Sequence, residues 1–144
     1  MAGALVRMHH AYDARRFMLP PDVESGYQGW FGQELQNKKA RILVVESAPQ
    51  VLQGYAYARV EPKDWNALRH KCVMLHDIFV EEDFRRHGAA GKLIDAVAEW
   101  STQLHVGQLV LNSAWQNAGA HALFESRGFR RTMVEMTRDL DDGK

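Results

Sequence analysis

A basic, glycine-containing segment separates an apolar run from a pattern typical of a helix. It extends from Arg85 to Lys92 and contains two arginines, a histidine, two glycines and a lysine. Small residues let backbone N–H groups approach an anion closely, and the start of a helix adds unpaired N–H groups and the positive end of its dipole. The segment therefore predicts a phosphate or pyrophosphate site, although such a turn alone also describes an ordinary solvated helix start.

A histidine in the preceding apolar run could take part in acid–base chemistry. His76 stands four residues before Val80, and an unperturbed imidazole titrates near ~6.5, close to working pH. Two interpretations stay open: a general base, or a strand histidine that is hydrogen-bonded to a neighbouring loop. In a regular strand the next residue, Asp77, points to the opposite face, which predicts a structural role for it.

Hydrophobic periodicity and turn residues indicate which elements must position these side chains. Two helices come first, two strands joined by a short turn follow, and strands then alternate with helices. The order implies an α/β fold in one domain, residues 1–144, with a mixed, mostly antiparallel sheet flanked by helices. The predicted helices span 8–17, 25–37, 91–104 and 117–126, and the predicted strands span 41–46, 51–60, 73–80 and 108–112, with a closing strand or hairpin at 129–140.

Length and composition narrow the class of protein. The 144 residues carry no formal net charge, which argues against a nucleic-acid binder and against a protein held on acidic membranes by charge. No apolar run approaches the ~20 residues that span a bilayer, and the N-terminus lacks the apolar core of a secretory signal. The lone Cys72 lies in an apolar run, which predicts a buried, inert thiol and fits a cytoplasmic protein. The histidines lack metal-ligand spacing, so no metal is expected.

A second motif lies some thirty residues after the basic turn, in the predicted helix at 117–126. It combines an asparagine, an alanine and an aromatic residue with a closing Gly-Phe pair. Its members are Asn117, Ala120, Phe124, Gly128 and Phe129.

The two motifs together resemble the GNAT acetyltransferase superfamily. Arg85–Ala90 matches its pyrophosphate signature, with Gly88 and Ala90 at the small-residue positions. The resemblance extends from about residue 40 to the end and is nearest to the polyamine and thialysine acetyltransferases, which act on small amines. Family members usually begin with a strand, which is shortened or absent here, so we expect a homodimer in which a partner chain covers an exposed sheet edge.

The resemblance implies acetyl-CoA as cosubstrate and direct transfer of the acetyl group to an amine. The pantetheine arm would lie along the end of the strand at 73–80, in a gap between splayed strands, and the pyrophosphate would bind the turn that follows. The residues implied in cofactor binding are Ile78, Phe79, Val80, Arg85, Arg86, His87, Gly88, Ala89, Ala90, Gly91, Lys92, Asn117 and Phe124.

The resemblance also bears on the catalytic groups. His76 stands where related polyamine and thialysine acetyltransferases carry a glutamate, which makes it the best candidate for the general base. Phe124 stands where many relatives carry a tyrosine that protonates the leaving thiolate, and phenylalanine cannot donate a proton. Either the thiolate leaves unaided or another hydroxyl serves. The candidates for that hydroxyl are Tyr12, Tyr27, Tyr55 and Tyr57.

The acceptor amine is expected near the first two helices and the loop at 61–71. Small size and the similarity around residues 75–80 favour a small-molecule amine. Two alternatives stay open: a protein acetyltransferase that acts on lysine or an N-terminus, and a non-catalytic acyl-CoA-binding sensor, which Phe124 supports.

Overall fold

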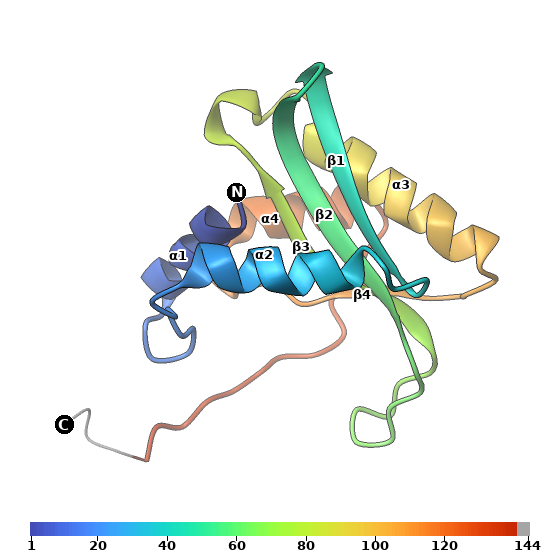
Figure 1. The fold of residues 1–144 in the computed structure, drawn as a ribbon. Helices are drawn as coiled ribbons and strands as arrows, with labels where there is room; N and C mark the ends of the chain where they lie inside the picture. Colours follow the sequence, from blue (N-terminus) through green and yellow to red (C-terminus); the bar gives the residue numbers. More distant parts are fainter. Residues whose placement is uncertain (141–144) are drawn as a thin grey trace.

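The computed structural model describes residues 1–140 of the chain. A four-stranded sheet forms its centre, in the order β1 (Ala40–Ala48), β2 (Val51–Glu61), β3 (Cys72–Val80) and β4 (Leu109–Leu111) (Figure 1). The first three strands are antiparallel to one another, and β4 is parallel to β3. The expected mixed, mostly antiparallel sheet is therefore confirmed.

Helices cover both faces of this sheet. On one face, α1 (Ala2–Tyr12) and α2 (Val23–Glu34) pack over Tyr55, Tyr57 and Phe79. On the other, α3 (Ala89–Gln103) and α4 (Ala118–Ser126) enclose the main core. Successive side chains of a strand point to opposite faces. For this reason Tyr55 and Tyr57 of β2 meet α1 and α2, while the alternating Ala56 and Ala58 face α3 and give it room to approach.

The longest helix, α3, is held by one apolar stripe. Leu93, Ile94, Val97 and Trp100 recur at three- and four-residue spacing, and all four are buried against the sheet. The helix begins two residues earlier than expected, at Ala89, because its first turn already packs on the core.

The N-terminal region differs in detail from the expectation. The helix predicted at 8–17 is wrong in position, since α1 ends at Tyr12. Asp13 stops it, because its carboxylate accepts the backbone N–H groups of Arg15 and Arg16 and so forms a turn. Among residues 1–140 no strand precedes β1, as expected, so β1 has β2 as its only described partner.

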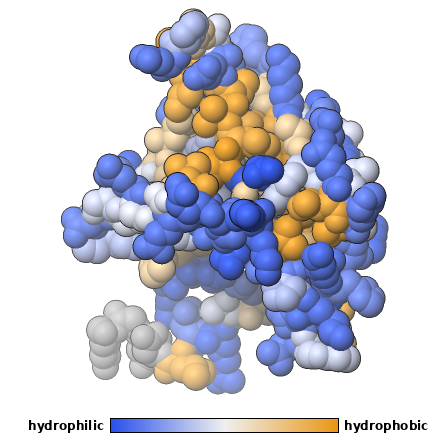
Figure 2. Space-filling model, turned by 45° about the vertical axis from the view of Figure 1, so that its right-hand side comes forward, coloured by the Kyte–Doolittle hydropathy of each residue, from blue (hydrophilic) through white to orange (hydrophobic). Residues whose placement is uncertain are grey.

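The hairpin of β1 and β2 leaves apolar side chains open to solvent. Val44, Val51 and Leu52 are among the exposed hydrophobic residues. Apolar surface also gathers on the upper half of the molecule in the view of Figure 2. An open strand edge next to apolar surface favours contact with another chain.

The strand or hairpin predicted at 129–140 is wrong. These residues form no helix or strand, and Figure 1 shows them leaving the sheet after α4 as an extended segment. Ion pairs from Arg16 to Glu135 and from Arg15 to Asp139 tie the segment to the turn after α1. A strand needs a neighbour for its N–H and C=O groups, and this path carries the segment away from the sheet.

Candidate functional site

The sheet opens between β3 and β4. The two strands pair only from Val73 with Leu109 to Leu75 with Leu111, where β4 ends. β3 continues to Val80, and in the described chain no strand lies against residues 76–80 on that side. The backbone N–H and C=O groups along this edge can therefore pair with a ligand.

A small cavity of about 70 Å³ lies at this opening, and we call it the fork cavity. It is enclosed by α1, by β3, by the loop after β4 and by α4. His76 belongs to its wall, as do the two side chains singled out on the second motif, Asn117 and Phe124. The other lining residues are Leu5, Met8, His9, Leu75, Ile78, Leu111, Asn112, Ser113 and Ala120.

The basic turn forms an open cradle at the start of α3. Arg86 and Gly88 have left-handed backbone conformations, with φ of 64° and 82°. The first N–H groups of an α-helix have no partner within the helix. In α3 the N-cap residue is Gly88, which has no side chain to accept a hydrogen bond from them. A Cβ built on Gly88 meets nothing within 4 Å, so an anion can approach this backbone closely. Open backbone N–H groups at a helix start, beside arginine and lysine side chains, are features that bind anions.

Two arginine side chains lie beside this cradle and make different contacts. The Nε of Arg85 donates to the backbone oxygen of Val80 at 2.9 Å, and its guanidinium lies over the ring of Phe79. This side chain ties the turn to the end of β3. Arg127, which the sequence reasoning missed, reaches from the end of α4 to the first turn of α3, where a Cβ on Gly91 would collide with it. The only signal for it in the sequence is the glycine itself.

The residues of the second motif cap α4 and pack it against the core. Asn117 caps the helix, because its Oδ1 accepts the backbone N–H of Ala120 at 3.1 Å. Phe124 is buried and meets Phe129 edge to face, with ring centroids 5.8 Å apart. Both residues face the fork cavity, so the motif brings α4 to the opening between β3 and β4.

A β-bulge sets the direction of His76. Tyr57 pairs with Asp77 and Ala58 pairs with Leu75, so His76 is the extra residue of β3. Its ring stacks on Tyr57 with centroids 5.4 Å apart, while Asp77 accepts the hydroxyl of Tyr55 at 3.0 Å. Because the two tyrosines share one face of β2, the expectation that His76 and Asp77 point to opposite faces is wrong.

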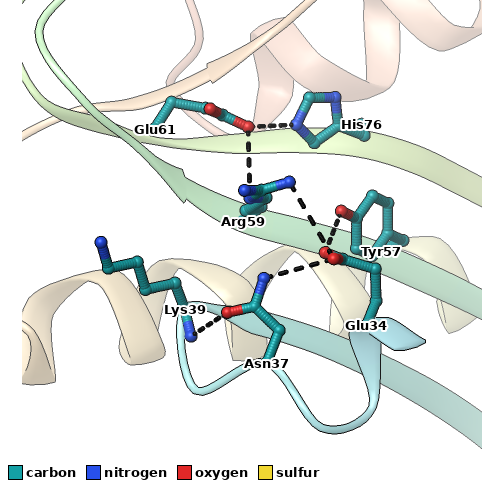
Figure 3. A network of polar contacts seen from close by, with 7 residues as sticks. All are labelled: Glu34, Asn37, Lys39, Tyr57, Arg59, Glu61 and His76. Carbon is teal, nitrogen blue, oxygen red and sulfur yellow. Dashed lines mark hydrogen bonds and ion pairs between the residues drawn. The ribbon is translucent and has the colours of Figure 1, made fainter. Parts of the chain in front are cut away.

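His76 ends a chain of polar contacts on the α1 and α2 face (Figure 3). Its Nε2 lies 2.9 Å from Oε1 of Glu61 on β2. Arg59 lies between two carboxylates, 3.9 Å from Glu61 and 3.9 Å from Glu34. The imidazole thus has a carboxylate partner on the neighbouring strand, not the loop partner considered for it.

Glu34 is the buried end of this chain. It accepts the Tyr57 hydroxyl at 2.6 Å and the amide of Asn37 at 3.2 Å. The Tyr57 hydrogen bond in particular holds the pKa of the Glu34 carboxyl below its ordinary value. Burial and the carboxylate in turn raise the pKa of Tyr57, so its hydroxyl stays protonated and keeps donating.

A second buried carboxylate lies beside the bulge. Asp77 accepts hydrogen bonds from Tyr55 and Tyr27. Burial raises the pKa of Asp77 despite these bonds, and burial followed by the Asp77 charge raises the pKa of both tyrosines. Three of the four candidate proton donors, Tyr27, Tyr55 and Tyr57, therefore already donate to carboxylates.

The remaining expectations concern Cys72 and metals. Cys72 is buried as predicted, and burial raises the pKa of its thiol. Within residues 1–140, no three histidine, cysteine or acidic side chains come together in a way that could hold a metal ion. None of the helices in this part of the chain combines the length and apolar character needed to cross a membrane.

Comparison with known proteins decides the family. Residues 6–129 match the model of the Acetyltransferase (GNAT) family. The chain belongs to the GNAT acetyltransferase family. It is therefore an acyltransferase, and acetyl-CoA is the cosubstrate of its family.

Two curated relatives show how far the sequence similarity extends. N-acetyltransferase 8 of Homo sapiens is 31% identical over 71 residues, which are 49% of this chain and 31% of the human protein. The uncharacterised N-acetyltransferase YhfO of Bacillus subtilis is 23% identical over 128 residues, which are 89% of this chain and 83% of that protein.

Solved structures share the fold. A tetramutant of BH1408 from Bacillus halodurans has a TM-score of 0.81 at 18% identity. The superposition covers 95% of this chain and 88% of the BH1408 chain. The aminoglycoside 6′-N-acetyltransferase AAC(6′)-IG of Acinetobacter haemolyticus has a TM-score of 0.69 at 25% identity, with 85% of this chain and 86% of its own covered.

Proposed function

We propose that the protein transfers the acetyl group of acetyl-CoA to a primary amine of a small molecule. The observation that carries this proposal is His76, which a β-bulge turns toward the tyrosine-lined face of the sheet while it still borders the fork cavity. The similarity to a solved aminoglycoside 6′-N-acetyltransferase supports a small amine as acceptor. We also propose that two copies form a homodimer, which the open sheet edges support.

The residues around the opening fit acetyl-CoA. The free edge of β3 at 78–80 would pair with the pantetheine amides, and the N–H groups from Arg86 to Lys92 would take the pyrophosphate. Asn117 and Phe124 would line the path toward the fork cavity. When bound, the cosubstrate supplies an acetyl group already activated as a thioester.

His76 is proposed as the general base. An ammonium has no free electron pair, so it must lose a proton before it can attack the thioester carbonyl. The Glu61 carboxylate accepts a hydrogen bond from Nε2 of the ring, which leaves the lone pair on Nδ1 to take the proton. Glu61 then lies beside the imidazolium that forms, and we assign it a positioning role.

The reaction also requires a hydrogen-bond donor for the carbonyl oxygen and the departure of the CoA thiolate. The carbonyl oxygen that gains charge needs a hydrogen-bond donor, and β3 offers backbone N–H groups at the bulge and along its free edge. Phe124 cannot protonate the departing thiolate, and the hydroxyls of Tyr27, Tyr55 and Tyr57 donate to carboxylates. We propose that the thiolate leaves without an acid from position 124.

The acceptor side carries negative charge that suits a cationic amine. Glu34, Glu61 and Asp77 lie on the face covered by α1 and α2, where Trp30 packs edge to face on Tyr57. Carboxylates and aromatic rings attract an ammonium and hold it near His76.

The test measures thiol release from acetyl-CoA with polyamines, thialysine, aminoglycosides and a lysine peptide as acceptors. His76→Ala is expected to lose turnover while it still binds acetyl-CoA. The matched control is His121→Ala, a histidine on α4 outside the fork cavity, which should behave as wild type. Turnover on the peptide alone would favour a protein acetyltransferase.

The second candidate function is a non-catalytic acyl-CoA-binding sensor. Phe124 favours it, because phenylalanine cannot protonate a leaving thiolate. Tight binding of acetyl-CoA without thiol release on any amine would support the sensor and contradict the proposed transfer.

A further inference from the structure

A second histidine lines the fork cavity. His9 of α1 belongs to the cavity wall together with His76, and its side chain is half-buried. Leu5 and His9 are four residues apart, so they share the face of α1 that closes the cavity. The ring of His9 also packs against Tyr12 and Phe17, with centroids 6.1 Å and 5.1 Å away. These contacts hold an imidazole at the place where the acetyl group would be transferred.

A hydrogen bond to the backbone decides which ring nitrogen of His9 is free. Nδ1 lies 3.0 Å from the backbone oxygen of Leu5. A carbonyl oxygen only accepts hydrogen bonds, so Nδ1 carries a hydrogen and donates it. Nε2 lies on the other side of the ring and has no hydrogen-bond partner among residues 1–140. When the ring is an imidazolium, Nε2 also carries a proton, which it can give to a group in the cavity.

The fork cavity lacks the hydroxyl that would protonate a departing thiolate. Phe124 lines it and has no proton to give. Three of the four candidate tyrosines donate to carboxylates, and the fourth, Tyr12, is not among the residues that line the cavity. His9 and Phe124, in contrast, border the same space of about 70 Å³. A sulfur atom that leaves beside Phe124 is therefore close to Nε2 of His9.

We propose that His9 is the general acid of the transfer and gives the proton of Nε2 to the sulfur of CoA as it leaves. The inference rests on the proposed function, to which it adds a residue. His76 keeps the role of base, because its Nε2 is hydrogen-bonded to Glu61 and its Nδ1 is left to take a proton. The acid and the base then come from two different elements, α1 and β3.

The proton transfers balance as follows. After His76 has taken one proton from the ammonium, the amine nitrogen bonds to the carbonyl carbon of the thioester and loses a second proton to solvent. The C–S bond then breaks, and its electron pair goes to sulfur, which takes the proton of His9. Solvent reprotonates His9 and accepts the proton held by His76. An ammonium and acetyl-CoA thus give an amide, the CoA thiol and one proton.

Thiol release from acetyl-CoA, with an amine that the wild type acetylates, measures the contribution of His9. His9→Ala should lower kcat about 100-fold, the low end for a general acid, because the CoA thiol is a tolerable leaving group. The KM for acetyl-CoA should stay unchanged, since the β3 edge and the cradle are intact. The matched control is His10→Ala. His10 is the next residue of α1, but its Nδ1 bonds to the backbone oxygen of Phe17 and it does not line the cavity.

A tyrosine at position 124 separates an acid from a structural role. In the His9→Ala background, Phe124→Tyr should raise kcat about tenfold or more, because it returns a proton donor to the cavity. In the wild-type background the same substitution should have a much smaller effect. A wild-type kcat in His9→Ala, or a loss that Phe124→Tyr leaves unchanged, would overturn the assignment.

Ligand binding tests the same contact without turnover. Desulfo-CoA lacks only the sulfur of CoA, the atom that His9 is proposed to meet. In heteronuclear NMR spectra the ring signals of His9, assigned by their absence in His9→Ala, should shift more with CoA than with desulfo-CoA. Equal shifts in an active enzyme would contradict the role of His9 alone. Failure to acetylate any amine, with the CoA-specific shift present, would contradict the transfer reaction and with it the acid role, but not the contact with sulfur.

Discussion

The hydrogen bond between Tyr57 and the buried Glu34 allows a quantitative test of the polar chain behind His76. Tyr57→Phe deletes one hydroxyl and keeps the ring that stacks on His76 and meets Trp30. The deleted group donates at 2.6 Å to a carboxylate that is only 9% exposed. A hydrogen bond to a charged buried group contributes about 2 kcal/mol to the free energy of unfolding. We therefore expect this loss at neutral pH, or a melting temperature lower by roughly 4–8 °C.

The loss should depend on pH with a definite sign. The pKa of Glu34 is lowered in the folded protein, so its stabilising contribution is complete above its ordinary pKa of ~4.3 and disappears as the pH falls through the folded value. Tyr57→Phe lets that pKa rise toward its ordinary value. The difference between variant and wild type should shrink on acidification to about 1 kcal/mol, the contribution of a neutral hydrogen bond.

Urea unfolding at neutral and acidic pH measures both quantities. Tyr12→Phe is the matched control, since Tyr12 lies at the end of α1, outside this polar chain. A double-mutant cycle with Glu34→Gln isolates the pairwise coupling from other effects of each change. A loss at neutral pH below about 0.5 kcal/mol, the range of ordinary surface substitutions, would refute the reasoning. So would a loss of equal size at both pH values.

Three further predictions concern turnover and cofactor binding. Glu61→Gln should lower kcat about tenfold, as expected for one partly exposed charged hydrogen bond, and leave the KM for acetyl-CoA unchanged; an unaltered kcat would remove Glu61 from the mechanism. Gly88→Ala should weaken acetyl-CoA binding by about 1–2 kcal/mol, seen by calorimetry, because φ is +82° there; wild-type affinity would contradict the cradle. Phe124→Tyr should keep or raise thiol release, and a large fall with the fold intact would show that position 124 does not hold an acid.

Much of the fold could be predicted because it depends on local patterns. The apolar stripe of α3, from Leu93 to Trp100, and the turn between β1 and β2 are visible in neighbouring residues. The cradle at Arg86 and Gly88 could be found for the same reason, since small residues before a helix predict an open N-terminus.

The features that could not be predicted depend on contacts between residues far apart in the sequence. The bulge at His76 depends on the pairing of β3 with β2, and nothing in residues 73–80 themselves announces it. In the same way, Glu61 meets His76 only because β2 and β3 are adjacent. Residues 129–140 have the composition of a strand, but a strand forms only where the path of the chain brings it against a sheet edge, and no local pattern indicates that path.

The opening in the sheet begins where the pairing of β3 with β4 ends, at Leu75, directly before the β-bulge at His76. β3 has nine residues and β4 has three. Their pairing stops at Leu75 and Leu111, and the rest of β3 is left with a free edge. Leu109 and Leu111 on β4 pack against the main core together with Phe124 on α4. The apolar contacts that stabilise the fold therefore also keep β4 apart from the second half of β3. A ligand that pairs with residues 78–80 meets a strand edge that is already free. Substitutions that lengthen the pairing of β4 with β3 should close the fork cavity before they reach any residue that touches the acetyl group.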